Sequence, residues 1–533
     1  MMRAFPPRFR LAIAAAALAV LVASAVASAA TSPTAYTTKG AWNFQSAPRL
    51  HPPKLSVDAN GVKAPLAPGY YLVANFKNIL SKAKFAGQGG PLILDSHLRP
   101  VWFRPVTNGL FTNNLEVQTY QGKPALSWWQ GTITATGVTT QGSDLLVDQH
   151  YKPIGKPLTA KAPWVITQHE MIVSGHDAWV TANAPVTVKP GQVPGCATCT
   201  NVLDSAVQEY DLTTGKLVYS WDALAHIPLS QAEQPASPKA PWDAYHINSI
   251  QLISGGHGGR FLASMRNTWA GYLVDIATSN IVWTVGGKAS TFSFANSNAR
   301  FSWQHDIELH SKGLLSLFDD HCCQLTGNPS APFVTPTGQS RGLLLRLDMG
   351  KHTATYVHQY AIKGTPRYTA FQGNMNLLPN HNVLVGWGSS PYVSEFTYSG
   401  KLITDITFPT PDLTYRGYVS SWVGLPSTDQ LRAVAVKRNG KTTVYASWNG
   451  ATKVAGWRVL GGASAKHLKT VATAVKSGFE TALPLSQGYA SYAIVALDSH
   501  GHVLARRAFG AGSGSSGSGG SGSGGSGTGP GGY

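Results

Sequence analysis

The chain has 533 residues and a formal net charge of +17, yet only 13% of its residues are charged. Glycine, proline and aromatic residues are plentiful; this composition is typical of short strands joined by tight turns and argues against helices with charged outer faces. The positive charge includes no lysine or arginine run, no helix-turn-helix and no zinc-finger spacing, so nucleic acid is not an expected partner. A diffuse positive field that attracts an anionic small molecule fits the excess, as does a simple solvated surface.

Residues 1–29 are typical of an export signal. Three arginines precede an apolar run that begins at Leu11 and ends near Val26, and small residues follow as at a cleavage site. The run approaches the length of a transmembrane helix, so an uncleaved anchor is the alternative interpretation. We expect cleavage and therefore a secreted, extracellular chain.

One pattern recurs six times between about residues 40 and 430: an apolar strand, an aspartate, a short turn and a second strand. A clear copy is VQEYDLTTGKLVYSW from Val207, and Tyr398 replaces the aspartate in the sixth copy. The turn aspartates of the other copies are Asp95, Asp148, Asp211, Asp275 and Asp348. Each unit predicts a hairpin, and a second hairpin precedes most copies.

Repeats of four strands are typical of propeller blades. We therefore predict an all-β fold with a six-bladed β-propeller over residues 30–438. A β-sandwich is the alternative, but it gives no reason for a long repeat. Short alternating strands over 439–509 predict a small immunoglobulin- or fibronectin-like β-sandwich. The Gly/Ser-rich segment 510–533 predicts a flexible tail without apolar residues to fold around.

The four cysteines are Cys196, Cys199, Cys322 and Cys323. An even number in an exported chain suggests disulfides. A zinc site is the weaker interpretation, because the adjacent pair does not match the usual spacing of zinc ligands. Three pairings are conceivable, and the sequence does not choose among them.

Three consecutive repeats begin their first strand with a histidine: His169, His246 and His305. The first strand of a propeller blade lines the central channel, so equivalent positions are expected to converge on one funnel. Arg266 and Asn267 follow a second strand and are expected at the same mouth. Three histidines suit a zinc or copper ion, but they also suit a nucleophilic histidine with cationic helpers. Arg266 favours the second hypothesis, because a cation is unfavourable beside a metal ion and useful beside an oxyanion.

Short sequence motifs spread over most of the predicted propeller resemble those of the arylsulfate sulfotransferase family, whose members do not use the nucleotide sulfate donor. They are LILDSHLRPVWF, LSWWQG, QHE at 168–170, VQEYDLTTGK, HINSIQ, SMRNTW, IVWTVGG and WQHDIELHSKGLLSLFDD. The C-terminal motifs WNGAT and GFET are similar to motifs in the sandwich domain of actinobacterial and fungal-type members. Their order and spacing together carry the resemblance.

The resemblance implies ping-pong transfer of a sulfuryl group from an aryl sulfate to a phenol through a sulfohistidine. It makes His305 similar to the sulfated histidine, and His246, Asn248 and Arg266 similar to a clamp on the sulfuryl oxygens. His169 and Asn267 complete the predicted site, with no metal and no cofactor. A protonated His169 or His246 would donate to the leaving oxygen.

Two other functions stay open at this point. One is a non-catalytic extracellular propeller that binds a cell-wall polymer or a partner protein, which would suit the basic charge and the sandwich. The other is a sulfate-ester hydrolase, in which water replaces the phenol. Turnover of a chromogenic aryl sulfate, with and without a phenol acceptor, separates the three functions.

Overall fold

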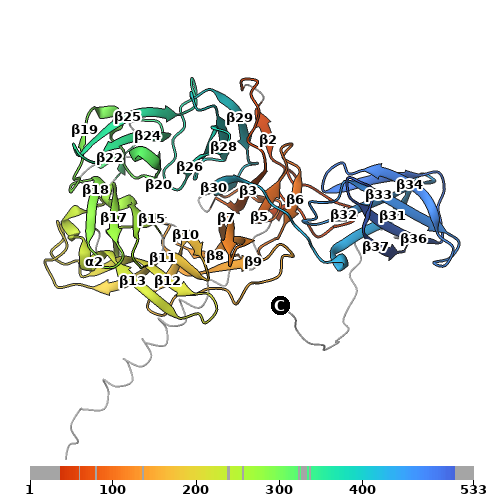
Figure 1. Ribbon diagram of the computed structural model, residues 1–533, viewed down its shortest axis with the longest axis horizontal. Coiled ribbons are helices and arrows are strands. Elements are labelled where there is room, and N and C mark those ends of the chain that lie inside the picture. The colour runs from red at the N-terminus through yellow and green to blue at the C-terminus, as the bar shows by residue number, and fades with distance from the viewer. Residues whose placement is uncertain are drawn as a thin grey trace, which may run out of the picture. The chain divides into compact units, whose positions relative to one another are not determined.

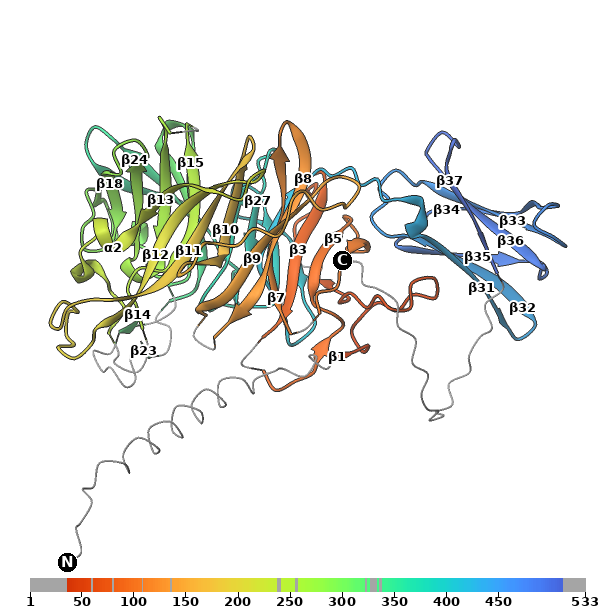
Figure 2. The ribbon, with the colours of Figure 1, turned by 90° about the horizontal axis from the view of Figure 1, so that it is seen from below.

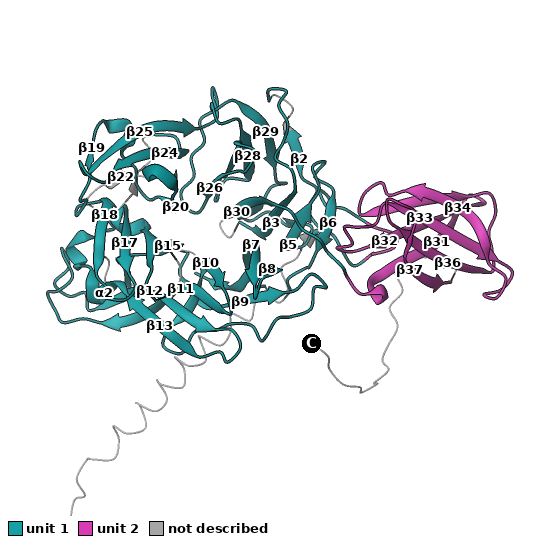
Figure 3. Cartoon of the chain, viewed as in Figure 1, with its two compact units in different colours: residues 1–43, 49–425 teal, residues 44–48, 426–533 magenta. Residues whose placement is uncertain are grey.

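The computed structural model describes residues 36–510 except 59–60, 79–80, 108, 135–136, 237–240, 255–256, 322–323, 326–332 and 335–337. The predicted export signal, the Gly/Ser tail beyond residue 510, Cys322 and Cys323 lie outside the described residues. The described chain forms two compact units, one of residues 36–43 and 49–425, the other of 44–48 and 426–510 (Figure 3).

Helical segments are short in the described residues. The α-helix α2 spans Ala223–His226 and is capped by the carboxylate of Asp222, which accepts a hydrogen bond from the Ala225 N–H. The 3-10 turns are η1 (Leu229–Gln231), η2 (Arg266–Thr268), η3 (Ser297–Ala299), η4 (Ser311–Gly313) and η5 (Thr428–Gln430). None of the helices in the described part of the chain is long and apolar enough to cross a membrane.

The first unit is built mainly from six antiparallel sheets that follow one another along the chain (Figure 1). The first three sheets comprise β3 (Tyr70–Lys77), β5 (Gly90–Leu94) and β6 (Pro100–Phe103); β7 (Phe111–Tyr120), β8 (Lys123–Ile133) and β9 (Thr139–Val147); and β10 (Val165–Ser174), β11 (Asp177–Thr187), β12 (Asn201–Asp211) and β13 (Leu217–Asp222). The short β14 (Trp242–Asp243) adds to β12 in parallel. Figure 2 shows the long strands β8 to β12 side by side.

In the next three sheets, as in the second and third, the main strands lie side by side in the order in which they follow along the chain. They comprise β15 (Ile247–Ile253), β16 (Arg260–Met265), β17 (Ala270–Asp275) and β18 (Ile281–Gly286); β20 (His305–Leu309), β21 (Leu314–Asp319), β24 (Arg341–Asp348), β25 (Thr353–Tyr360) and β19 (Ser293–Phe294); and β26 (Asn374–Leu377), β27 (Val383–Gly386), β28 (Tyr392–Phe396), β29 (Leu402–Thr407) and β2 (Ser56–Asp58). Two-stranded pairs are β1 (Tyr36–Thr37) with β4 (Phe85–Ala86), and β22 (Gln324–Leu325) with β23 (Phe333–Val334).

The end of this unit returns to its beginning. The strand β30 (Asp412–Ser420) pairs antiparallel with β3, and the early strand β2 pairs antiparallel with β29. One edge strand of each sheet contacts the corresponding edge strands of the two neighbouring sheets, in the circular order β30, β7, β10, β15, β20, β26 and again β30. We call these six the inner strands.

The hydrophobic core is divided in the same circular way. Each of six buried clusters lies between two consecutive sheets, and the cluster around Tyr71 and Leu384 joins the last sheet to the first. Tryptophans fill these layers: Trp128 and Trp129 are neighbours on β8 but point into different clusters, because side chains alternate across a strand. Burial of apolar side chains between the sheets therefore favours ring closure as well as sheet formation.

The predicted hairpins and turn aspartates are confirmed. Asp211 accepts hydrogen bonds from the N–H groups of Thr213 and Thr214, and Gly215 has φ +71°, a conformation that favours glycine. The carboxylates of Asp95, Asp148, Asp275 and Asp348 accept backbone N–H groups in their own turns. These bonds satisfy turn N–H groups that the sheet ladder leaves unpaired.

The second unit contains a sheet of β31 (Leu431–Arg438), β32 (Lys441–Trp448) and β35 (Glu480–Leu485), and a sheet of β34 (Lys469–Val475), β33 (Gly456–Gly462), β36 (Ser491–Leu497) and β37 (Val503–Phe509). Both sheets contribute to one core that includes Trp457. The unit begins at Pro426, ahead of the boundary expected from sequence at 438/439, because β31 pairs with β32. It also takes in Phe44–Pro48: Phe44 stacks on Phe479, with ring centres 4.3 Å apart.

Candidate functional site

The inner strands leave regular pairing where the predicted site residues lie. β15 is irregular around Asn248, and β20 between His305 and Glu308. β10 is irregular over the longer stretch between Ile166 and Met171, which contains His169. β7 and β30 have irregular pairing as well. Because bulges bend a strand and re-aim its side chains, they explain how these residues leave the two faces of their sheets.

Four residues on or directly before the inner strands have left-handed backbone conformations: Asn114 (φ +54°), His246 (φ +58°), Asp306 (φ +56°) and Gln372 (φ +70°). Such φ values are uncommon for residues other than glycine, and Asn, Asp and His adopt them more readily than most. They persist where the surrounding structure over-determines the backbone, which happens most often at functional sites.

Side chains rather than backbone ladders connect one inner strand to the next. The amide of Asn114 donates to the carbonyl of His169 at 2.6 Å, and that of Asn248 donates to the carbonyl of Gln304 at 2.7 Å. The amide of Asn374 donates to the carbonyl of Gly417 at 2.8 Å. Gly417 lies on β30, which we call the closing strand because it pairs with β3 at the start of the unit. The geometry of the site is therefore set by polar side chains that span the gaps between sheets.

His305 is almost completely buried, and both of its ring nitrogens have partners. Nδ1 lies 2.6 Å from Oδ2 of Asp320, and Nε2 accepts the N–H of Gln372 at 3.2 Å. A nitrogen that accepts carries no proton, so Nδ1 holds the proton and donates it to Asp320. Burial, followed by the positive charge of Arg266, holds the pKa of His305 well below its ordinary value. The result is a neutral imidazole with its lone pair at Nε2.

His246 and His169 form the second part of the site, with ring centres 4.8 Å apart. Nδ1 of His246 lies 2.5 Å from Oδ2 of Asp243, at the end of β14, and this pair is partly exposed. Nδ1 of His169 instead contacts the hydroxyl of Thr167 at 3.0 Å. Burial, followed by the charge of His246, holds the pKa of His169 well below its ordinary value. His169 is therefore the less suitable of the two as a protonated donor.

Arg266 stands at the junction of β16 and η2. Its guanidinium donates to Asn267 Oδ1 at 3.0 Å and to the Ala370 carbonyl at 2.9 Å, and lies 4.7 Å from the ring centre of Trp303. Asn267 in turn donates to the carbonyl of Asp243 at 2.6 Å. The predicted ligand Asn267 thus links Arg266 to the segment that holds His246, and both hydrogen bonds of its amide are made within the protein.

Several polar atoms of this region are buried without a hydrogen-bond partner among the described residues. They are Arg266 Nε, Asn248 Oδ1, Gln304 Oε1, Asp320 Oδ1 and Gln372 Oε1. Buried polar groups are normally paired, so such a concentration is typical of a place where a polar ligand completes the bonding.

Sequence reasoning did not single out Asp243, Tyr415 or Arg416. Tyr415 presents its ring edge-on to His169 and His305, with centres 5.8 and 6.0 Å away. Tyr415 and Arg416 belong to the closing strand, which follows the sixth repeat, so the repeat alignment contained no signal for them. Asp243 lies three residues before His246 and could have been considered as its partner from that spacing.

A group of side chains with the spacing of metal ligands lies elsewhere. Among the described residues, one set of three metal-ligating side chains has its ligand atoms within 4.8 Å of one another: His176, Asp177 and Asp211, of which none is buried. The Nδ1 atoms of the three site histidines contact Asp320, Asp243 and Thr167 instead.

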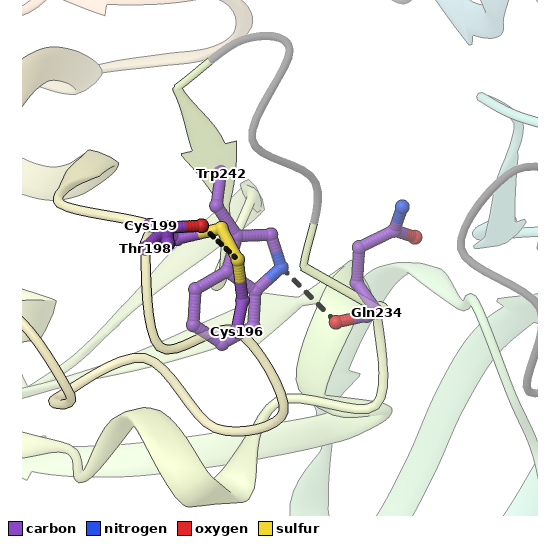
Figure 4. Close-up of a disulfide and its surroundings, with 5 residues drawn as sticks. All are labelled: Cys196, Thr198, Cys199, Gln234 and Trp242. Atoms are coloured by element: carbon purple, nitrogen blue, oxygen red, sulfur yellow. Dashed lines mark hydrogen bonds between the residues drawn. A yellow bond between two sulfur atoms is a disulfide. The ribbon is translucent and has the colours of Figure 1, made fainter.

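One of the disulfide pairings left open by the sequence is formed, between Cys196 and Cys199 in the β11–β12 loop (Figure 4). Beside it, Trp242 donates from its indole nitrogen to the carbonyl of Gln234 at 3.0 Å. Cys199 and Trp242 share one core cluster. Since Asp243 follows Trp242, this packing supports the segment that holds His246.

The family model described as Arylsulfotransferase (ASST) matches residues 116–409. No curated protein matches the sequence. Among solved structures, the chain is similar to a protein of unknown function from Bacteroides caccae (10% identity, 66% of this chain and 98% of that chain, TM-score 0.38). It is also similar to TolB from Acinetobacter baumannii (9%, 65% and 67%, TM-score 0.30) and to the Dos1 propeller (9%, 76% and 76%, TM-score 0.25).

Proposed function

The chain belongs to the arylsulfotransferase family, and on that basis we propose that it transfers a sulfuryl group from an aryl sulfate to a phenol through a sulfohistidine at His305. The observation that carries this proposal is the orientation of the buried His305 ring. Its proton lies on Nδ1 against Asp320, and its lone pair lies on Nε2. A neutral imidazole held in that tautomer is a nucleophile that needs no separate base.

In the first half-reaction Nε2 of His305 attacks sulfur, and the bond between sulfur and the phenolic oxygen breaks. The positive charge that develops on the sulfated ring is balanced by Asp320, which accepts the Nδ1 proton in a hydrogen bond. Burial raises the pKa of this carboxyl, and the charge of Arg266 counteracts that rise, so we assign Asp320 the ionised form beside the sulfated ring. His246, held by Asp243, donates a proton to the departing phenolate. In the second half-reaction a phenol gives its proton to His246, attacks sulfur and leaves as the new aryl sulfate.

Sulfuryl transfer should resemble phosphoryl transfer, with a loose transition state and negative charge on the peripheral oxygens. Fixed donors must therefore face those oxygens. We assign this role to Arg266 and to the N–H of Gln372, which is released from His305 Nε2 when that atom binds sulfur. Asn248 has a side-chain oxygen without a partner among the described residues, which suits it to a position beside the substrate. Asn267 orients Arg266, and neutral His169 packs against His246.

The proposal extends to the fold and location of the chain. We infer that the six sheets are the blades of a closed propeller, and that the second unit is an immunoglobulin-like sandwich. The circular contacts of the inner strands and the shared core of the second unit support this. We further propose that the N-terminal segment directs export, so that the enzyme acts outside the cytoplasm. There its net positive charge would favour association with an anionic cell wall.

The test is phenol release from a chromogenic aryl sulfate, with and without a second phenol. His305→Gln should abolish turnover, whereas His310→Gln, at the end of the same strand segment, should not. With donor alone, wild-type protein should retain a sulfuryl group on the peptide that contains residue 305, detected by mass spectrometry. Sustained phenol release beyond one equivalent per enzyme without an acceptor would identify a hydrolase, and no phenol release with any donor would leave a binding module.

A further inference from the structure

We propose that Tyr415 and Arg416, on the closing strand β30, are positioning residues that hold the histidines of the site in register. The kinetic part of this inference rests on the proposed function, but its structural part does not. Both residues lie where β30 leaves regular pairing with β3: Val73 pairs with Gly417 and Asn75 with Thr414. Two residues of β30 therefore oppose the single residue Ala74, and this bulge turns them toward the inside of the ring.

Arg416 connects three other inner strands. Its guanidinium lies 2.8 Å from Glu170 Oε2 on β10, 2.8 Å from the Asn248 carbonyl on β15 and 3.4 Å from Asp306 Oδ1 on β20. Glu170 follows His169, and Asp306 follows His305. Each partner is thus a predicted site residue or the immediate neighbour of one.

The contacts suit arginine better than any other cation. The side chain is 1% exposed, and a buried guanidinium with its planar array of donors can serve several acceptors at once. Asp306 also accepts the N–H of Met375 at 3.0 Å, so the same carboxylate extends the connection to β26. One residue thereby fixes the distances between strands that share no backbone ladder.

Tyr415 complements this connection from the preceding position. Its ring stands nearly perpendicular to those of His169 and His305, at 90° and 86°. Its hydroxyl donates weakly to the Asn248 carbonyl at 3.4 Å. The aromatic ring packs against both histidines, while Arg416 binds the carboxylate of the residue that follows each of them.

The same arrangement has an electrostatic consequence. The ionisable and charged groups facing His305 are Asp320, Arg266, His169, His246, Tyr415 and Arg416. Loss of the Arg416 charge would remove one of the positive charges that disfavour protonated His305, and would leave Glu170 and Asp306 without their cation. Removal of that positive charge raises the pH at which His305 becomes protonated.

Arg416→Lys and Arg416→Met separate geometry from charge. Lysine keeps the charge but cannot serve three strands, so kcat/KM should fall about tenfold to a hundredfold while the acid limb of its pH profile stays in place. Methionine should lower kcat/KM further and move the limb to higher pH. If Arg416→Met does not fold, the same change combined with Glu170→Gln and Asp306→Asn removes the unpaired carboxylates.

The matched control is Arg367→Met, which removes a partly buried arginine whose partners Asp405 and Ser394 lie on β29 and β28. It should lower stability without moving the pH profile. A kcat/KM for Arg416→Lys within twofold of wild type would overturn the proposal. So would a shift in the Arg367→Met profile equal to that of Arg416→Met.

Ring-¹⁵N NMR of histidine-labelled protein provides a readout that needs no turnover. In Arg416→Met, the His169 and His305 signals should titrate at higher pH than in wild type, while the signals of His500 and His502 in the second unit should not change. Unchanged His169 and His305 signals would refute the positioning role. If wild type shows no turnover but these signals move, the proposed function fails and the positioning role stands.

Discussion

Replacement of Asp320 by asparagine tests the central feature of the site with almost no change in volume. In the native protein the Nδ1 proton of His305 points to a carboxylate 2.6 Å away, and Nε2 faces the Gln372 N–H. If the amide nitrogen of the new asparagine faces the ring, the proton must move to Nε2. Nε2 then loses its lone pair, and two N–H groups oppose each other.

If the amide oxygen of the new asparagine faces His305 instead, the tautomer survives but the counter-charge for a sulfated imidazolium is lost. Either orientation therefore slows sulfuryl transfer to His305. The equivalent change in a Ser-His-Asp triad lowers kcat by about 10⁴-fold, or about 5.5 kcal/mol. We expect a loss of about 10³- to 10⁴-fold for Asp320→Asn, because the pair here is buried and the His305 ring is oriented by a second hydrogen bond.

The assay is single-turnover release of phenol by enzyme in excess over donor, with folding checked by circular dichroism and thermal unfolding. Asp319→Asn is the matched control, because Asp319 is equally buried but is paired with Arg341. That variant should lose stability and keep its rate per folded molecule within about tenfold of wild type. A loss smaller than tenfold in Asp320→Asn, or an equal loss in both variants, would refute the assigned role of Asp320.

Four further outcomes follow from the structure. The acid limb of kcat/KM should lie well below pH 6.5, because burial and Arg266 lower the pKa of His305; a limb at or above that value would contradict a neutral nucleophile. Burial raises the pKa of Asp412 from 3.8 to about 8, so the folded state retains a proton that the unfolded chain releases. Stability should therefore fall as pH rises from about 4 to 8, by up to about 1.4 kcal/mol per unit from this group, and Asp412→Asn should flatten that slope in urea unfolding curves. Replacing Cys196 and Cys199 by serine should cost at most about 2 kcal/mol, because the closed loop is short; a larger loss of stability would show that the disulfide supports more than its own loop. Glu480→Ala should lower the unfolding free energy of the second unit by about 1–2 kcal/mol, because its carboxylate accepts N–H groups from the 44–48 segment; hydrogen exchange in that segment should rise, and unchanged exchange would argue against the contact.

Much of the fold was predictable, since it depends on local chemistry that repeats. Turn aspartates such as Asp211 and Asp275 are visible in the sequence because each makes its bonds within a few residues. The pattern also placed His169, His246 and His305 at the start of consecutive sheets. The boundary at Pro426 was not predictable in this way, because the pairing of β31 with β32 has no repeat to mark it.

The partners of the histidines were harder to predict, because they come from different distances along the chain. Asp320 lies 15 residues after His305, and Gln372 lies 67 residues after it. Arg416 lies 246 residues after Glu170, and the two meet only because β30 closes the ring. A repeat alignment aligns equivalent positions, but it does not show which side chain crosses from one sheet to the next.

Equivalent positions in the repeat also do not give equivalent chemistry. His305 has a buried carboxylate at Nδ1, His246 has a partly exposed one, and His169 has only a hydroxyl. A buried carboxylate fixes a tautomer and stabilises a cation once it forms, whereas an exposed pair can exchange protons with a substrate. The irregular pairing of β10, β15 and β20 contributes to these differences, because it presents each ring to a different neighbour. Three histidines at equivalent positions can therefore take different roles, as nucleophile, proton donor and neutral packing partner. Identical surroundings for all three would give them the same role.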